Sequence, residues 1–149
     1  MKFKAKIAEG FQYGSSNTDF AVDGQYLTDA ELEVIQKFME DISQGKPLQG
    51  KNKPSWVDDD HNFIPGTEGY REENYWHYHC GPTWKDFTFR GVTYDLKFNP
   101  GGEHSKECIH YAKISEDQIS IVGYSRDHLP FKLSKHKDNP FFSDEDDDE

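Results

Sequence analysis

The chain has 149 residues, a length typical of one domain with one hydrophobic core. Hydrophobic residues make up 34% of the chain and aromatic residues 15%, and its mean hydropathy is −0.96, so we expect a small core built largely from aromatic side chains. No apolar run approaches the roughly 18 residues of a membrane-spanning helix. Cys80 and Cys108 are too few for a disulfide framework and the N-terminus lacks a signal-peptide core, which favours the cytoplasm.

The formal net charge of −11 argues against a general nucleic-acid binder, because phosphate binding requires Lys and Arg. The acids are unevenly placed. Asp144 to Glu149 supply six of the 28, so residues 1–143 carry 22 acids against 17 bases, a net charge of −5. We expect residues 138–149 to form a disordered acidic tail after a single α+β domain over residues 1–137. The tail either aids solubility or mimics phosphates and shields a basic groove.

The first eight residues alternate apolar side chains with lysines, which predicts a half-buried strand with a basic outer face. Its short length and its lysines favour a position at a sheet edge. Residues 9–24 are rich in Gly, Ser, Asn and Asp, so they are expected to form a loop, with a short strand at residues 20–22.

A helix is predicted to begin after Thr28, because Thr28 and Glu31 have the spacing of a capping box. Apolar residues then recur at the three-and-four spacing of a helix with one buried face, namely at Leu32, Ile35, Phe38, Met39 and Ile42. Gly45, followed by Pro47, is typical of a helix end. We interpret the stripe as ordinary core.

The connection over residues 46–71 contains prolines, glycines and an acidic run, which predicts irregular structure. Its Lys46, Lys51 and Lys53 could bind phosphates, or could belong to a solvated face. The run from Asp58 to Asp60 before His61 could hold a cation, although it lacks the Gly and the distal Glu of a calcium loop. From residue 75 onward the pattern becomes that of strands, predicted at residues 75–80, 87–98, 107–114 and 119–124, with a turn at 99–102 and a hairpin loop at 115–118. Phe141 and Phe142 are expected to pin the root of the acidic tail.

Residues two apart in a strand share a face, so His77 and His79 are expected to project to the same side of the sheet. His128 follows the last predicted strand, at a sheet end where functional loops gather. These histidines are the first candidates for chemistry.

Three motifs carry a family resemblance: His77-Tyr78-His79, Cys108-Ile109-His110-Tyr111 and the stretch from Ile121 to Ser125-Arg126-Asp127-His128. In this order after an N-terminal helix they resemble the YafO-like branch of the RelE/ParE toxin superfamily, over about residues 27–128. The resemblance implies an α+β fold in which the helix packs on a twisted antiparallel sheet. It also implies a ribosome-dependent mRNA endoribonuclease of a type II toxin–antitoxin system, without a cofactor or metal, whose partners are mRNA on the ribosome and a cognate antitoxin. This chain departs from the strongly basic family pattern in having three arginines and an acidic tail.

RNA cleavage by the 2′-hydroxyl needs a base, an acid and a cation that stabilises the phosphate. Histidine suits proton transfer near neutral pH, and arginine suits phosphate. The candidate catalytic residues are therefore His77, His79, His128, Arg90 and Arg126. The candidate RNA-binding residues are Tyr111 and Tyr124 for base stacking, with Lys51, Lys53, Lys132 and Lys135 for the backbone. For each histidine a structural hydrogen-bonding role is an equal alternative.

Two other functional classes stay open. His77 and His79 with His128, His110 or an acid could form a metal site, although Thr83 and Trp84 stand where a cupin would carry its acid. The second class is a non-enzymatic acidic protein: an inhibitor, an immunity protein or a nucleic-acid mimic that binds a basic protein partner. Cys80 is interpreted as a small buried hydrophobic residue.

Overall fold

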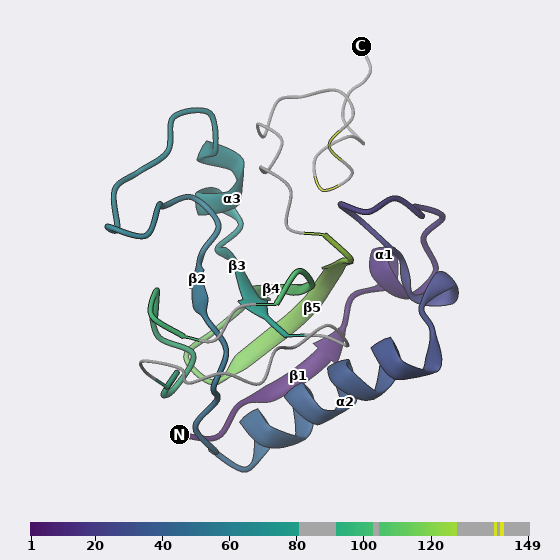
Figure 1. Cartoon of the computed structure of the whole chain (residues 1–149), viewed down its shortest axis with the longest axis horizontal. Helices are drawn as coiled ribbons and strands as arrows, with labels where there is room; N and C mark the ends of the chain where they lie inside the picture. Colours follow the sequence, from purple (N-terminus) through teal and green to yellow (C-terminus); the bar gives the residue numbers. More distant parts are fainter. Residues whose placement is uncertain (81–91, 103–104, 128–138, 140, 142–149) are drawn as a thin grey trace.

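The computed structural model describes residues 1–80, 92–102, 105–127, 139 and 141. In this part of the chain five strands form one mixed sheet in the order β1-β5-β4-β3-β2 (Figure 1). The strands are β1 (Lys4–Ile7), β2 (Asn52–Pro54), β3 (Tyr75–His79), β4 (Cys108–Lys113) and β5 (Gln118–Ser125). The helices are α1 (Glu9–Gln12), α2 (Asp29–Ser43) and α3 (Glu68–Glu72), with a 3₁₀ turn, η1 (Gly24–Tyr26). The α+β prediction is confirmed.

Helix α2 begins and ends where the sequence predicts. The Thr28 hydroxyl accepts from the Glu31 amide at 3.2 Å and the Glu31 carboxylate accepts from the Thr28 amide at 2.8 Å, so the capping box is complete. Gly45, two residues after the helix, has φ of +73°, a conformation that favours glycine.

The predicted stripe of α2 is buried at Ile35, Phe38 and Ile42, each 3% exposed. Met39 is partly buried against the core, and Leu32 is 40% exposed. In the first turn the buried position is Glu31, because Glu31 turns inward to bind Arg126.

The sheet departs from the predicted antiparallel arrangement at β1, which pairs with β5 in parallel. The chain between β1 and the later strands crosses over through α2, and such a crossover is what a parallel pair requires. β1 is an edge strand, as predicted. The other pairs are antiparallel, and β4 and β5 form the predicted hairpin.

Three stretches differ from prediction. The expected loop at residues 9–24 contains α1, which buries Phe11, and the expected irregular connection at 46–71 contains β2 and α3. β2 lies at the second sheet edge, where its Pro54 can be accommodated. For the predicted strand at 87–98, residues 87–91 lie outside the described residues. In residues 92–98, Thr93 forms an isolated antiparallel bridge with Leu48, and a turn follows at Asp95 and Leu96, which have positive φ.

A β-bulge divides the hairpin. His110 pairs with Gly123 and Tyr111 pairs with Ile121, so Val122 has no partner in this register. The extra residue changes which side chains point to each face. Tyr124, rather than Gly123, joins Ile119 and Ile121 in the core.

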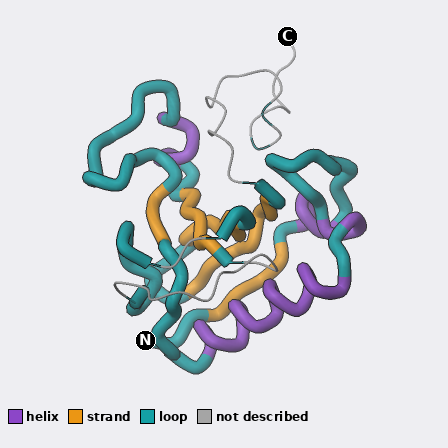
Figure 2. Tube along the Cα trace, in the orientation of Figure 1, coloured by secondary structure: helices purple, strands orange, loops and turns teal. Residues whose placement is uncertain are grey.

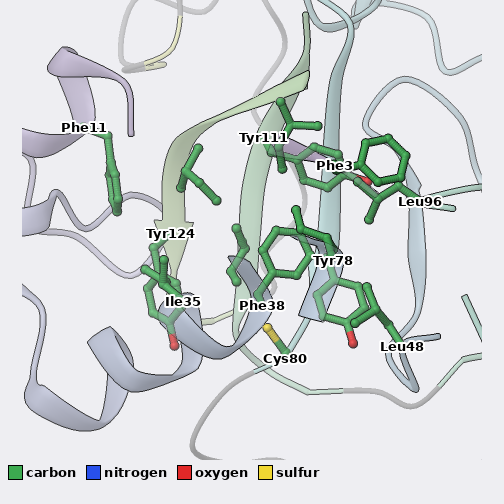
Figure 3. Packing of buried hydrophobic residues seen from close by; sticks show 14 of the residues in the cluster. Phe3, Phe11, Ile35, Phe38, Leu48, Tyr78, Cys80, Leu96, Tyr111 and Tyr124 are labelled. Carbon is green, nitrogen blue, oxygen red and sulfur yellow. The ribbon is translucent and has the colours of Figure 1, made fainter. Parts of the chain in front are cut away.

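Helix α2 runs along the sheet (Figure 2). The hydrophobic core lies between α2 and one face of the sheet (Figure 3). We call this face the helix face. It carries Tyr78 and Cys80 from β3 and the residue after it, with Ile109, Tyr111, Ile121 and Tyr124 from β4 and β5. Phe38 of α2 stacks on Tyr78 with ring centroids 5.1 Å apart. No helix among the described residues is long and apolar enough to cross a membrane.

Replacing Thr28 with Ala should lower the free energy of unfolding by about 1 kcal/mol, because the first turn of α2 loses its side-chain cap. Urea denaturation followed by circular dichroism measures this change. Thr28→Ser keeps the hydroxyl and is the matched control, with a much smaller effect. Equal destabilisation by both substitutions would contradict the capping role.

Candidate functional site

The sheet face opposite α2 carries polar side chains from four strands and their ends. Directly opposed residues of antiparallel strands point to the same side, and the register opposes His77 to both Lys53 and His110, and Cys108 to both His79 and Ser125. We call this surface the histidine face. Its members are Lys51, Lys53, Ser55, His77, His79, Cys108, His110 and Ser125.

Three imidazoles gather at the centre of the histidine face. The ring centroids of His77 and His79 are 5.3 Å apart, and those of His77 and His110 are 6.3 Å apart. The prediction that His77 and His79 share a face is therefore confirmed. All three side chains are at most 2% exposed, so a substrate reaches them only if the groups above them move.

Hydrogen bonds orient each of the three rings. The Ser55 hydroxyl lies 3.0 Å from Nδ1 of His77. Nδ1 of His79 lies 3.1 Å from the Ser105 carbonyl oxygen, which can only accept, so this nitrogen carries a proton. A neutral His79 ring therefore has its lone pair on Nε2.

The His110 ring is oriented through a serine. Its Nε2 lies 2.7 Å from the Ser125 hydroxyl, and that hydroxyl donates to the Phe20 carbonyl oxygen. Because the single Ser125 proton is used on Phe20, Nε2 of His110 must be the donor to Ser125. The Phe20 loop and β5 together fix this ring.

Two lysines stand beside the histidines and share one carboxylate. Lys51 Nζ and Lys53 Nζ lie 2.8 Å and 2.9 Å from Oδ1 of Asp59. Both lysine side chains are largely covered, at 6% and 12% exposure, whereas Asp59 is 56% exposed. Burial acts to raise the pKa of Asp59, but the hydrogen bonds and charges of the two ammonium groups outweigh it and lower the pKa from 3.8 to about 2. An anion thus already occupies the position between the lysines.

Arg126 lies away from the histidine face. Its guanidinium grips Glu31 at the start of α2, with Nε 2.8 Å from Oε2 and Nη2 3.0 Å from Oε1. Nη2 also donates to the Tyr26 carbonyl oxygen at 2.8 Å. This bidentate pair joins the end of β5 to α2. In this structure Arg126 therefore stabilises the fold, and it does not lie at the predicted phosphate-binding position.

The two tyrosines predicted to stack RNA bases belong to the helix face. Tyr111 and Tyr124 are both 0% exposed, and the Tyr111 hydroxyl donates to Oδ1 of Asn52 at 2.8 Å. Burial raises the pKa of both phenols. Their rings offer no surface to a base, because the core encloses them. Cys80 is buried there too, and burial raises its pKa, in line with the interpretation as a hydrophobic residue.

Four predicted site residues lie outside the described residues: Arg90, His128, Lys132 and Lys135. Among the described residues, no group of three or more His, Cys, Asp or Glu side chains is arranged to hold a metal ion. The structure thus brings together His77, His79, Lys51 and Lys53, and separates them from Arg126, Tyr111 and Tyr124.

Sequence reasoning gave His110 a role only in the metal alternative and gave Asp59 only a place in a possible cation-binding run, and it gave no role to Ser55 or Ser125. A hairpin register counted from the loop pairs Lys113 with Ile119, and it would pair His110 with Val122. The bulge shifts that pairing to Gly123 and lines up Ser125 with the histidine face. The acidic run at residues 58–60 is visible in the sequence, but its contact with the lysines depends on how the connection over residues 46–71 folds.

Comparison of the chain with protein-family models, with curated proteins and with solved structures finds no match.

Replacing Asp59 with Asn should destabilise the protein at neutral pH, because Lys51 and Lys53 lose their shared counter-charge. The pKa of Asp59 is depressed in the folded state, so its contribution is fully present above pH 3.8 and is lost as the pH falls through about 2. Unfolding midpoints measured across this range should converge for wild type and variant at the acid end. Asp60→Asn, at an exposed neighbour outside the ion pair, is the control. A difference that does not depend on pH would contradict this assignment.

Proposed function

We propose that the protein is a ribosome-dependent mRNA endoribonuclease that uses the histidine face of its sheet. The observation that carries the proposal is the strand register, which sets Lys53 beside His77 and Lys51 beside His79. The proposed proton-transfer groups on β3 thus lie opposite the proposed phosphate-binding cations on β2 and the residue before it. The motif resemblance adds a type II toxin–antitoxin context, with a cognate antitoxin as partner and the cytoplasm as location.

The proposed reaction is attack of a ribose 2′-hydroxyl on the adjacent phosphorus. One imidazole takes the proton of that hydroxyl, the new oxygen–phosphorus bond closes a 2′,3′-cyclic phosphate, and the bond to the 5′-oxygen breaks. A second imidazole protonates the departing oxygen, so this step consumes no water and requires no metal. Two histidines with ring centroids 5.3 Å apart are spaced suitably for sharing these roles. We assign them to His77 and His79, with His110 as their neighbour.

The phosphate charge is assigned to Lys51 and Lys53. In the resting protein Asp59 lies where the phosphate would bind, at hydrogen-bonding distance from both ammonium groups. Because Asp59 is 56% exposed and the lysines are nearly covered, the carboxylate is the member of the trio that can leave when RNA arrives. Binding would then exchange one anion for another, with little net desolvation of the lysines.

Replacing His77 or His79 with Gln should reduce mRNA cleavage by about 100-fold or more, because each variant loses a proton-transfer group. The measurement is primer extension on mRNA in a translation extract supplied with purified protein. His61→Gln, at an exposed histidine of the connection, is the matched control and should keep full activity. Failure of the wild-type protein to cut under these conditions would reject the proposed function.

A second candidate function is favoured by the charges. The described cations expected to meet phosphate, Lys51, Lys53 and Arg126, are each paired with a carboxylate of the chain itself. A protein with a net charge of −11 in which these three cations are neutralised presents mainly anionic groups to its surroundings. This favours a non-enzymatic acidic protein that binds a basic partner.

Deletion of residues 144–149 separates the two candidates. For the endoribonuclease, removing six acids should increase RNA affinity, most strongly at low ionic strength, because the lost repulsion is screened by salt. Fluorescence anisotropy of a labelled single-stranded RNA over a salt series measures the effect. RNA binding that is absent in both forms, with stoichiometric co-purification of a basic protein by the full chain alone, would favour the second candidate.

A further inference from the structure

Phe141 covers the histidine face from a distant part of the chain. Its ring centroid lies 5.1 Å from that of His110 and 5.7 Å from that of Phe20. It also approaches Tyr75 of β3 at 5.8 Å and Tyr70 of α3 at 6.3 Å. Three elements and a loop thus supply aromatic walls around one inserted ring.

The floor of this slot is the backbone of β5. A Cβ atom added to Gly123 would lie 2.7 Å from Cε1 of Phe141 and 2.9 Å from its Cζ, closer than real Cβ contacts allow. The slot therefore accepts a flat ring only because position 123 is glycine and because the bulge turns that glycine toward the histidine face.

A polar group accompanies the ring into the slot. Nδ2 of Asn139 donates to the Tyr70 hydroxyl at 2.8 Å, and the Phe141 amide donates to Oδ1 of Asn139 at 3.0 Å. Asn139 is 0% exposed. The occupant of the slot is thus an aromatic plane with an amide N–H group beside it, and an unpaired nucleobase combines these two features in a single flat group.

There is also room beside the inserted ring. A cavity of about 210 Å³ borders Phe141, Gly123 and Tyr75 and extends to Phe11 and Asp23. Burial raises the pKa of Asp23, which accepts a hydrogen bond from the Ser16 amide. The slot is therefore not a tightly closed piece of core.

We propose that the Phe141 slot is the binding site for an unpaired RNA base, and that Phe141 fills it in the resting protein until RNA displaces it. This inference rests on the proposed function and specifies it further, because it names the part of the substrate that the slot takes. A base in the slot would lie against His110 and would bring its ribose and phosphate next to His77 and His79. The same displacement would uncover the face of His110 that Phe141 packs on, and His110 is 2% exposed in the resting form.

The test uses the full chain and two substitutions that each take the Phe141 ring out of the slot, one by truncating the side chain and the other by blocking the place of the ring. Phe141→Ala removes the occupant. Gly123→Ala keeps the phenylalanine at position 141 but puts a Cβ atom where its ring lies, so the ring has to move out. Tyr13→Ala, at an aromatic residue that is 73% exposed, is the control. Circular dichroism and the unfolding midpoint verify that each variant is folded.

The first readout is hydrogen–deuterium exchange at the imidazole carbon of His110, measured by mass spectrometry. Both substitutions should accelerate this exchange, and the double variant should be no faster than the faster single one, because both remove the same contact. Unchanged exchange in both single variants would overturn the proposal.

The second readout is binding of a short labelled single-stranded RNA, compared with an abasic strand of equal length. Phe141→Ala should bind the RNA about tenfold more tightly, as expected if the open form is about a tenth of the wild-type population. The abasic strand should show no such gain, and Gly123→Ala should show none because its methyl group narrows the slot. An equal gain for the abasic strand would overturn base binding.

The mRNA cleavage assay keeps this inference separate from the proposed function. Base-dependent tightening without cleavage by the wild-type chain would reject the endoribonuclease and leave the base site standing. Cleavage that depends on His77 and His79, together with unchanged His110 exchange in the Phe141 and Gly123 variants, would support the endoribonuclease and overturn the base site.

Discussion

The antiparallel pairing of β3 with β4 is the constraint on which the rest of the structure depends. It sets Tyr78 opposite Ile109 on the helix face and His77 opposite His110 on the other. A shift of this register by one residue would move the histidines into the hydrophobic core and the aromatic residues to the polar side. The packing of Phe38 on Tyr78 stabilises the observed register, because the two rings can stack only when Tyr78 lies on the helix face, next to α2.

The bulge at Val122 has a comparable influence on the site. Without it, the alternation that buries Ile119 and Ile121 would also direct Gly123 to the core. With it, Tyr124 takes that place, and Gly123 and Ser125 turn to the histidine face. One extra residue therefore supplies both the floor under Phe141 and the hydroxyl that orients His110. Bulges are frequent beside functional sites for this reason: they redirect side chains at little cost to the ladder.

Carboxylates compensate the charges of the covered lysines and of Arg126. Lys51 and Lys53 are nearly covered, and burying their charges would be costly without Asp59 between them. Arg126 likewise stabilises Glu31. Burial acts to raise the pKa of this carboxyl, but the Arg126 and Thr28 hydrogen bonds outweigh it and lower the pKa overall. The two arrangements differ in one respect that matters for function. Glu31 is buried and Arg126 is partly exposed, whereas Asp59 is half-exposed and its lysines are covered, so under the proposed function Asp59 is the carboxylate that gives way to phosphate.

Elements with local signals are predictable from the residues alone. The capping box at Thr28, the stripe through Ile35 and Phe38, and the strand alternation around His77 and His79 each arise within a few residues, so periodicity and turn chemistry predict them. Contacts between distant groups follow from the folding of the whole chain: β1 pairs with β5 in parallel, Asp59 with the two lysines, Arg126 with Glu31, and Phe141 with His110. These contacts depend on strand order, on one bulge and on the path of long connections. None of them leaves a periodic trace in the chain, because the partners are brought together by the packing of the whole sheet and not by their spacing in the sequence.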